Sequence, residues 1–358
     1  MPIITGYEDA IREYEEAAAK GICLPAFAAE DRETLEAILA ASVDVAAEVG
    51  RPDLPVIVTW TTRYPLRPQM TKVFSCGDPS LGMQAMLSDL RILMSERGPY
   101  NRLRVLPHLD HFVPARDAAI LEDHWDNFAS VLVDASDMTD ADNIAITREY
   151  VDRFRGRRIV EGVVDCIGES GSPDGKVLKT TVEKARNFRE RTGVDLLVPN
   201  VGTEHRSTSQ TLEYDERLAR RISAEVGRIL SLHGTSSLNE RNFARLSECG
   251  FLKINIFTAL AVVGGQAVAR QVLENIGNLF DEKLLAAMTR EGIVGANVLA
   301  LRTDGKTMDA RPRLEYLANE HRRNAWFRAV KDMCRRYFFL LNYSRYGIIS
   351  PGCTERSH

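Results

Sequence analysis

Four of the seven histidines stand at the carboxyl ends of short apolar segments that we interpret as strands, or shortly after them. They are His108, His111, His205 and His233. A zinc ion that acts as a Lewis acid needs about three neutral imidazoles and one open coordination position. A single histidine is more often a buried, hydrogen-bonded side chain. Several at equivalent positions favour a shared metal site.

Asp110 lies between two of these histidines, in Pro-His-Leu-Asp-His at 107–111. Regular strand alternation aims Asp110 and His111 at opposite faces, so both can serve one site only where the strand curls into a loop. We therefore expect the strand to end at Leu109. A carboxylate beside a metal is a candidate general acid or base. The alternative is a loop cap for the following helix.

Other polar residues follow the later strands. Gly202 follows one strand, and Gly234, Thr235 and Ser236 follow another. Such residues offer backbone N–H groups and hydroxyls to a phosphate, although each signal alone is weak. Asn255 is polar within an apolar strand, where a buried amide must be paired, either as a structural bridge or with a substrate.

Eight short apolar segments alternate with longer segments of helical spacing. The expected strands are 22–27, 55–60, 103–108, 130–134, 158–167, 195–201, 229–233 and 252–256. Their spacing is close to the roughly 30 residues of one βα unit, which predicts an α/β fold, a (β/α)8 TIM barrel. All strands of that fold end on one rim, where the histidines would meet. A doubly wound sheet is less favoured, because no GxGxxG motif follows the first strand.

We expect a single domain over 1–358, since no low-complexity linker divides the chain. It begins with an N-terminal helix at 1–20 and ends with a C-terminal helical extension at 311–358. The extension is rich in arginine and aromatic residues. We interpret it as a helix packed on the barrel or on a second subunit, and nucleic-acid binding is the less favoured reading.

The composition narrows the class of partner. The 46 Lys+Arg and 50 Asp+Glu residues give a net charge of -4, so neither nucleic acid nor an anionic membrane is an expected partner. The six cysteines form no CxxC pair, which favours a reducing, cytoplasmic location. The sequence contains no stretch of eighteen apolar residues, so no membrane span is predicted.

Five ordered blocks resemble the class II (zinc-dependent) ketose-bisphosphate aldolases. They are HLDH at 108–111, SVLVDAS at 130–136, VGTEH at 201–205, LHGTS at 232–236 and KINIFT at 253–258. The similarity runs from about residue 25 to residue 347. Within the family, the chain resembles the fructose-bisphosphate and tagatose-bisphosphate aldolases.

The resemblance implies roles for individual residues. His111, His205 and His233 would hold one zinc ion per subunit, with a monovalent cation as a possible addition. Asp110 would handle the proton and Asn255 would contact substrate. Phosphate contacts are implied for Gly202, Gly234, Ser236 and Thr258. A sugar-phosphate-like substrate and a homodimer or homotetramer are implied as well.

Several positions depart from the family pattern. Cys166 stands roughly where the family has a fifth-strand glutamate that can ligate zinc. It would be either a fourth zinc ligand or a buried thiol. The last block has Phe257 in place of an aspartate, and Thr235 replaces a glycine. The paired loop acids are not plainly present, and Glu169 or Asp174 are the candidates to replace them. These departures favour a shifted substrate.

The expected activity is making or cleaving a carbon–carbon bond between a ketone donor, such as dihydroxyacetone phosphate, and an aldehyde, through a metal-stabilised enediolate. Two alternatives stay open. One is a metal-dependent hydrolase or isomerase on the same barrel. The other is a non-catalytic, aldolase-like partner subunit.

Overall fold

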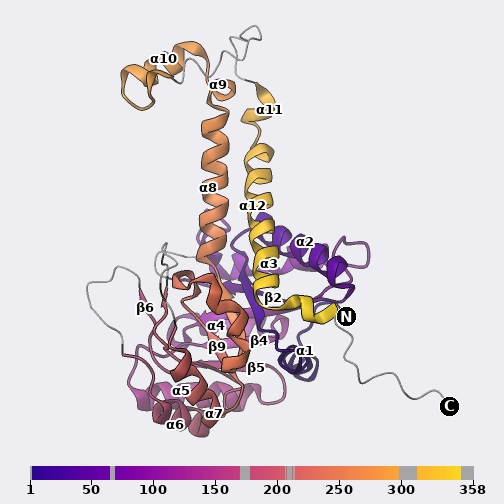
Figure 1. The fold of residues 1–358 in the computed structure, drawn as a ribbon, viewed down its shortest axis with the longest axis vertical. Coiled ribbons are helices and arrows are strands. Elements are labelled where there is room, and N and C mark those ends of the chain that lie inside the picture. The colour runs from indigo at the N-terminus through magenta and orange to yellow at the C-terminus, as the bar shows by residue number, and fades with distance from the viewer. Residues whose placement is uncertain are drawn as a thin grey trace, which may run out of the picture. The chain divides into compact units, whose positions relative to one another are not determined.

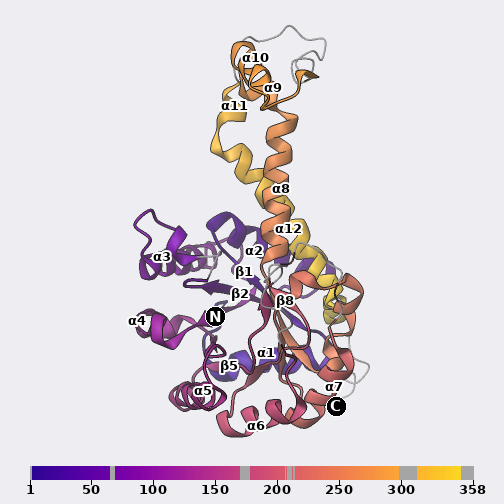
Figure 2. The ribbon, with the colours of Figure 1, turned by 90° about the vertical axis from the view of Figure 1, so that its left-hand side faces the viewer.

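Eight parallel strands close into a barrel in the order β1-β10-β9-β7-β5-β4-β3-β2. The computed structural model describes residues 2–64, 69–169, 178–205, 207, 212, 214–297 and 313–347. Figure 1 shows the strands enclosed by helices, and the turned view in Figure 2 shows the helices on the outside of the barrel. The prediction of a (β/α)8 TIM barrel is confirmed.

Each expected strand is present, within a few residues of its predicted bounds. The strands are β1 (Leu24–Ala28), β2 (Pro55–Thr61), β3 (Arg104–Phe112), β4 (Ser130–Val133), β5 (Ile159–Val163), β7 (Leu196–Val198), β9 (Leu230–Leu232) and β10 (Phe251–Ile256). Most of their residues are buried, because helices outside and side chains inside cover both faces. The sequence of each strand is therefore a short run of mostly apolar residues.

Six α-helices return the chain between neighbouring strands. They are α2 (Arg32–Val49), α3 (Pro79–Leu93), α4 (Pro114–His124), α5 (Asp140–Phe154), α6 (Val182–Thr192) and α7 (Glu216–Val226). Most begin at a side chain that accepts a backbone N–H bond, such as Asp31, Thr139 and Thr181. Between β9 and β10, an α-helix is replaced by three short 3-10 helices: η3 (Thr235–Ser237), η4 (Glu240–Arg245) and η5 (Ser247–Cys249).

The end of β3 differs from the prediction. The strand does not stop at Leu109 but continues to Phe112, and its register against β4 shifts between these two residues. His111 has a positive φ of 49°, which is uncommon for a residue with a Cβ atom. The expected change of direction is thus made by a bulge inside the strand, and Asp110 and His111 both line one pocket.

The interior of the barrel is unusually polar. Thr59, His108, Glu161, Ser231 and Lys253 are each no more than 1% exposed. Buried charges need partners, so the Glu161 carboxylate and the Lys253 ammonium must be paired within this interior.

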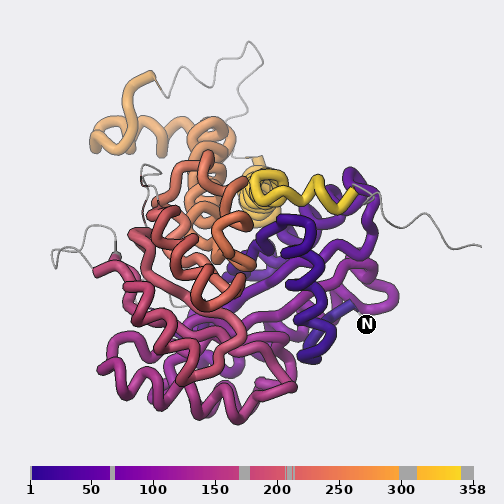
Figure 3. The backbone as a smooth tube through the Cα atoms, turned by 60° about the horizontal axis from the view of Figure 1, so that its bottom comes forward, coloured from indigo at the N-terminus to yellow at the C-terminus, as the bar shows by residue number. Residues whose placement is uncertain are grey.

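Segments near both ends of the described chain pack on the barrel. The N-terminal helix expected at 1–20 is α1 (Tyr7–Ala19). Within 331–340, the end of α12 (Asn319–Leu340), the Tyr337 and Phe338 rings contact the ring of Phe27 in β1. The following 3-10 helix, η7 (Tyr343–Gly347), donates a hydrogen bond from the Tyr343 hydroxyl to the Pro55 carbonyl at 2.9 Å. Figure 3 shows this yellow segment beside the indigo start of the chain.

The chain divides into two compact units, residues 1–259 with 331–358, and residues 260–330. The second contains most of α8 (Thr258–Glu274), then α9 (Ile276–Leu279), α10 (Glu282–Arg290), α11 (Leu314–Leu317) and the start of α12. Inside it, a Cβ atom added at Gly264 would lie 2.6 Å from the Trp326 ring, so these two helices approach closely there. The single domain expected over 1–358 stays a prediction, and sequence periodicity did not reveal this division. Among the described helices, none has the length and apolar character that crossing a membrane requires.

Candidate metal centre and active site

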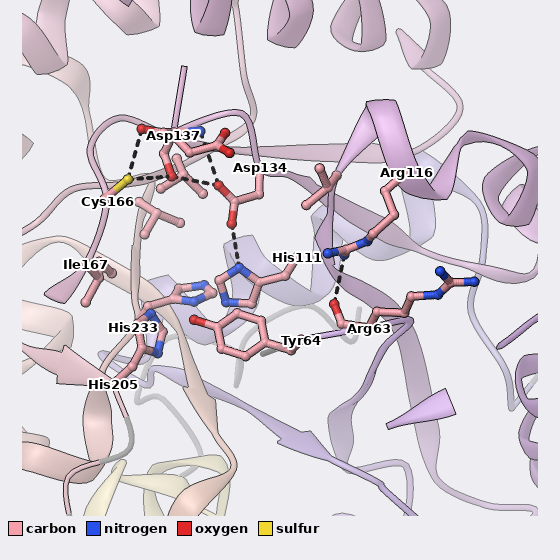
Figure 4. Close-up of a pocket in the computed structure, with 14 residues that line it drawn as sticks. Arg63, Tyr64, His111, Arg116, Asp134, Asp137, Cys166, Ile167, His205 and His233 are labelled. Atoms are coloured by element: carbon pink, nitrogen blue, oxygen red, sulfur yellow. Dashed lines mark hydrogen bonds and ion pairs between the residues drawn. The ribbon is translucent and has the colours of Figure 1, made fainter. Parts of the chain in front are cut away.

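Three histidines converge at the carboxyl-terminal rim of the barrel. His111, His205 and His233 each offer one nitrogen, and these nitrogens all lie within 4.8 Å of one another. Their ring centroids are 5.2 to 6.1 Å apart, and Figure 4 shows the three rings meeting beside Tyr64. His111 comes from the β3 bulge and His205 from β8 (Glu204–His205), a two-residue strand paired with β6 (Gly168–Glu169). His233 directly follows β9.

Two carboxylates, the half-buried Asp134 and the fully buried Glu161, orient two of these imidazoles. Asp134 accepts a hydrogen bond from His111 Nδ1 at 2.7 Å, and Glu161 accepts one from His233 Nε2 at 3.1 Å. The remaining nitrogen of each ring is therefore left as a potential metal ligand, as in carboxylate–histidine–zinc triads. Burial lowers the pKa of His233, which keeps its imidazole in the neutral form that binds a metal.

Beneath the histidines lies a fully buried charged cluster. Lys253 Nζ donates to Glu161 Oε2 at 2.6 Å and lies 3.0 Å from His108 Nε2. His108 Nδ1 is 2.7 Å from Ser130 Oγ. Burial alone would raise the pKa of Glu161, but the Lys253 ammonium holds it below its usual range, so Glu161 is a carboxylate. The cluster supports His233 from below.

Sequence reasoning missed Glu161 and did not place Lys253 in the site. A signal was present, since Glu161 is the one charged residue within β5, a strand otherwise made of Ile, Val and Gly. A charged residue at an inward position of a buried strand is costly unless it is paired. Lys253 is occupied by Glu161 and His108, which gives it a structural role in this site.

We expect Glu161→Gln to lower zinc affinity by about 10- to 100-fold, the usual effect of losing an outer carboxylate partner. Glutamine keeps the side-chain volume but removes the charge that holds His233 and Lys253. Competition with a zinc chelator would measure the affinity. Asp142→Asn, on the exposed start of α5, is the control. An unchanged zinc affinity in Glu161→Gln would exclude this orienting role.

Asp110 faces the same centre. Its Oδ1 accepts a hydrogen bond from Asn255 Nδ2 at 2.8 Å, and its Oδ2 is 3.5 Å from Thr61 Oγ1. Burial would raise the pKa of this carboxyl, but nearby His111 and the Lys253 ammonium hold it well below its usual range. An ionised, buried carboxylate beside the three histidines is equipped to accept a proton.

Two pockets open from the histidines. One of about 390 Å³, including space open to solvent, contains Asp110 and Asn255 together with four residues predicted to bind phosphate: Gly234, Thr235, Ser236 and Thr258. The Thr235 hydroxyl is turned away to the Asn255 carbonyl at 2.6 Å. Gly202 does not line this pocket, and its N–H donates to Asn200 Oδ1 at 2.9 Å.

The second pocket, drawn in Figure 4, has a volume of about 820 Å³ with its solvent-open space. Its wall includes Tyr64 and the apolar side chains of Val113, Val163, Ile167 and Val198. Among the residues that the structure describes, the three histidines alone line both pockets. A metal held by them would therefore face two separate binding spaces, which suits a reaction that joins or separates two molecules.

Cys166 is not among the converging ligands in the described part of the chain. Its thiol donates a hydrogen bond to the Ser136 carbonyl at 2.9 Å, and the residue is exposed on the wall of the second pocket. The backbone of Glu169 pairs with His205, while Asp174 and the side chain of Glu169 lie outside the described residues.

We expect Cys166→Ser to retain the full zinc content of the parent protein, because three histidines without the thiol make up the converging group. Elemental analysis and the absorption spectrum of the cobalt-substituted protein would check this. A sulfur-to-cobalt charge-transfer band that disappears in Cys166→Ser would instead restore Cys166 as a ligand.

A family model for class II fructose-bisphosphate aldolase matches residues 9–302 of the chain. The chain belongs to this family. As a member of the class II fructose-bisphosphate aldolase family, it is a lyase, and the match extends well beyond the site to most of the barrel.

Solved structures of similar fold include two bacterial proteins. The fructose-bisphosphate aldolase of Campylobacter jejuni has 17% identity and a TM-score of 0.71, with 95% of each chain covered. The YdjI aldolase of Escherichia coli K12 has 22% identity and a TM-score of 0.61, with 93% of this chain and 96% of that chain covered. At such identities the likeness shows a shared barrel fold.

Proposed function

We propose that the chain is a zinc-dependent aldolase that makes or cleaves a carbon–carbon bond between a ketone donor, such as dihydroxyacetone phosphate, and an aldehyde. The observation that carries this proposal is the convergence of three imidazoles beside the ionised Asp110, at the junction of two pockets. Family membership supports the reaction class. A homodimer or homotetramer in the cytoplasm stays a prediction.

The residues present fit a zinc ion. Tetrahedral zinc with Zn–N distances of about 2.0 to 2.1 Å needs ligand nitrogens roughly 3.4 Å apart, which small side-chain movements achieve from separations within 4.8 Å. Asp134 and Glu161 fix two of the imidazoles in orientations that leave one nitrogen available. When bound, zinc supplies a Lewis acid that polarises the donor ketone and stabilises negative charge on its oxygen.

The chain's own residues then divide the work. In cleavage, Asp110 accepts the proton from the hydroxyl on the carbon that becomes the aldehyde, and in synthesis it returns that proton. Asn255 orients Asp110 and contacts the donor. Backbone N–H groups and hydroxyls at Gly234, Ser236 and Thr258 hold the donor phosphate. The second pocket takes the aldehyde.

Incubating the zinc-loaded protein with ketose bisphosphates and trapping any released aldehyde tests this function directly. An aldehyde product that forms together with dihydroxyacetone phosphate supports the aldolase. Hydrolysis or isomerisation without a new aldehyde would contradict it and favour a metal-dependent hydrolase or isomerase. A protein that binds no zinc and cleaves no substrate would instead be a non-catalytic partner subunit.

A further inference from the structure

Thr59 is a buried hydroxyl residue with no assigned role. It lies in β2, is 1% exposed, and lines the pocket that contains Asp110 and Asn255. Its Oγ1 has no hydrogen-bond partner among the residues that the structure describes. A buried hydroxyl left unpaired is unfavourable in a folded protein, so an unpaired one on a pocket wall points to a ligand.

A second polar atom in the same pocket is also unpaired. Asn255 Oδ1 is buried and has no partner in the described part of the chain. The amide nitrogen of Asn255 is already used, since it donates a hydrogen bond to Asp110 Oδ1 at 2.8 Å. The amide oxygen is thus left to accept a hydrogen bond from a bound molecule.

These two unpaired atoms belong to residues of one pocket, and their chemistry limits the kind of group that can pair with them. Asn255 Oδ1 requires a donor, and the Thr59 hydroxyl can donate or accept. A phosphate dianion offers no donor to Asn255 Oδ1. A hydroxyl group can donate to Asn255 Oδ1 and accept from the Thr59 hydroxyl.

We propose that Thr59 is a specificity-determining residue whose hydroxyl binds the free hydroxyl group of the ketone donor. The inference rests on the proposed aldolase function and deepens it. The donor phosphate lies at the other end of the pocket, near Gly234, Ser236 and Thr258. Thr59 therefore selects a hydroxyketone over the corresponding ketone without a hydroxyl.

Ser231 provides a matched control. It lies in β9, is fully buried, and its hydroxyl also lacks a partner among the described residues. It is two residues before His233, so it faces the same interior, yet it lines neither pocket at the metal centre. An unpaired interior hydroxyl that cannot reach the donor is thus available for comparison with Thr59.

Calorimetric titration of the zinc-loaded protein with dihydroxyacetone phosphate and with hydroxyacetone phosphate, which lacks the free hydroxyl, tests the proposal. We expect Thr59→Val to weaken binding of dihydroxyacetone phosphate by about tenfold and to leave hydroxyacetone phosphate unchanged. Thr59→Ser retains the hydroxyl and should bind both as the parent does. Ser231→Ala should also match the parent for both ligands.

The melting temperature supplies an independent readout. Thr59→Val removes an unpaired buried hydroxyl, so its melting temperature without ligand should equal or exceed that of the parent. Equal weakening of both ligands, or unchanged binding of dihydroxyacetone phosphate, in Thr59→Val would overturn the role of Thr59. A parent protein that binds neither ligand would overturn the proposed donor itself, and this inference with it.

Discussion

Asp110→Ala is expected to reduce carbon–carbon cleavage by about 100- to 10,000-fold, the range typical of lost acid–base catalysis. The reason is that Asp110 is a buried, ionised carboxylate, and Asn255 holds one of its oxygens in place. Zinc content should remain that of the parent, since the three converging imidazoles do not include this side chain. Steady-state cleavage rates and elemental analysis on the same preparation would check both parts.

Two controls separate proton transfer from a change in structure. Asp110→Asn keeps the side-chain volume and should lose activity to a similar extent, because its amide cannot take up the proton. Asp126→Ala, an exposed carboxylate in η2 (Trp125–Asn127), should keep parental turnover. Turnover of Asp110→Ala close to that of the parent would remove Asp110 from its catalytic role.

His233→Ala should abolish zinc binding under conditions where the parent is saturated, and measurable cleavage with it. Loss of an outer partner costs about 10- to 100-fold in metal affinity, and loss of a ligand itself should cost more. The substitution also leaves the buried Glu161 without its hydrogen bond from the imidazole. Zinc content after dialysis, together with the cleavage rate, gives the measurement.

The matched control is His124→Ala, a histidine at the end of α4 whose Nε2 lies 3.1 Å from Ser80 Oγ and which belongs to neither pocket. It should retain full zinc and full activity. If His233→Ala also kept stoichiometric zinc and parental activity, the shared metal centre would be disproved and the proposed function with it.

Much of this site was predictable from local sequence. The positions of the eight strands follow from apolar periodicity, and a parallel barrel brings the strand ends to one rim. That placed His111, His205 and His233 in one region although they are distant in the chain. The roles given to Asp110 and Asn255 came from ordered blocks shared with a known family.

Other predictions depended on contacts that no local pattern encodes. Cys166 stands close to the expected ligand position in sequence, yet its thiol bonds to Ser136. The strand predicted to end at Leu109 continues through a bulge, because pairing with β4 resumes at Phe112. Gly202, expected beside phosphate, does not line the pocket in which Gly234 and Ser236 lie.

The sequence by itself determined the barrel and brought four histidines and Asp110 to its rim, because periodicity and strand ends are properties of neighbouring residues. The choice of three of these histidines as ligands came from the family resemblance. Only the tertiary structure decided how these groups are held. Glu161 reaches His233 across 72 residues and Lys253 across 92, and Asn255 reaches Asp110 across 145. Hydrogen bonds between residues so far apart in the chain depend on barrel closure and strand register, which set the position and direction of each side chain.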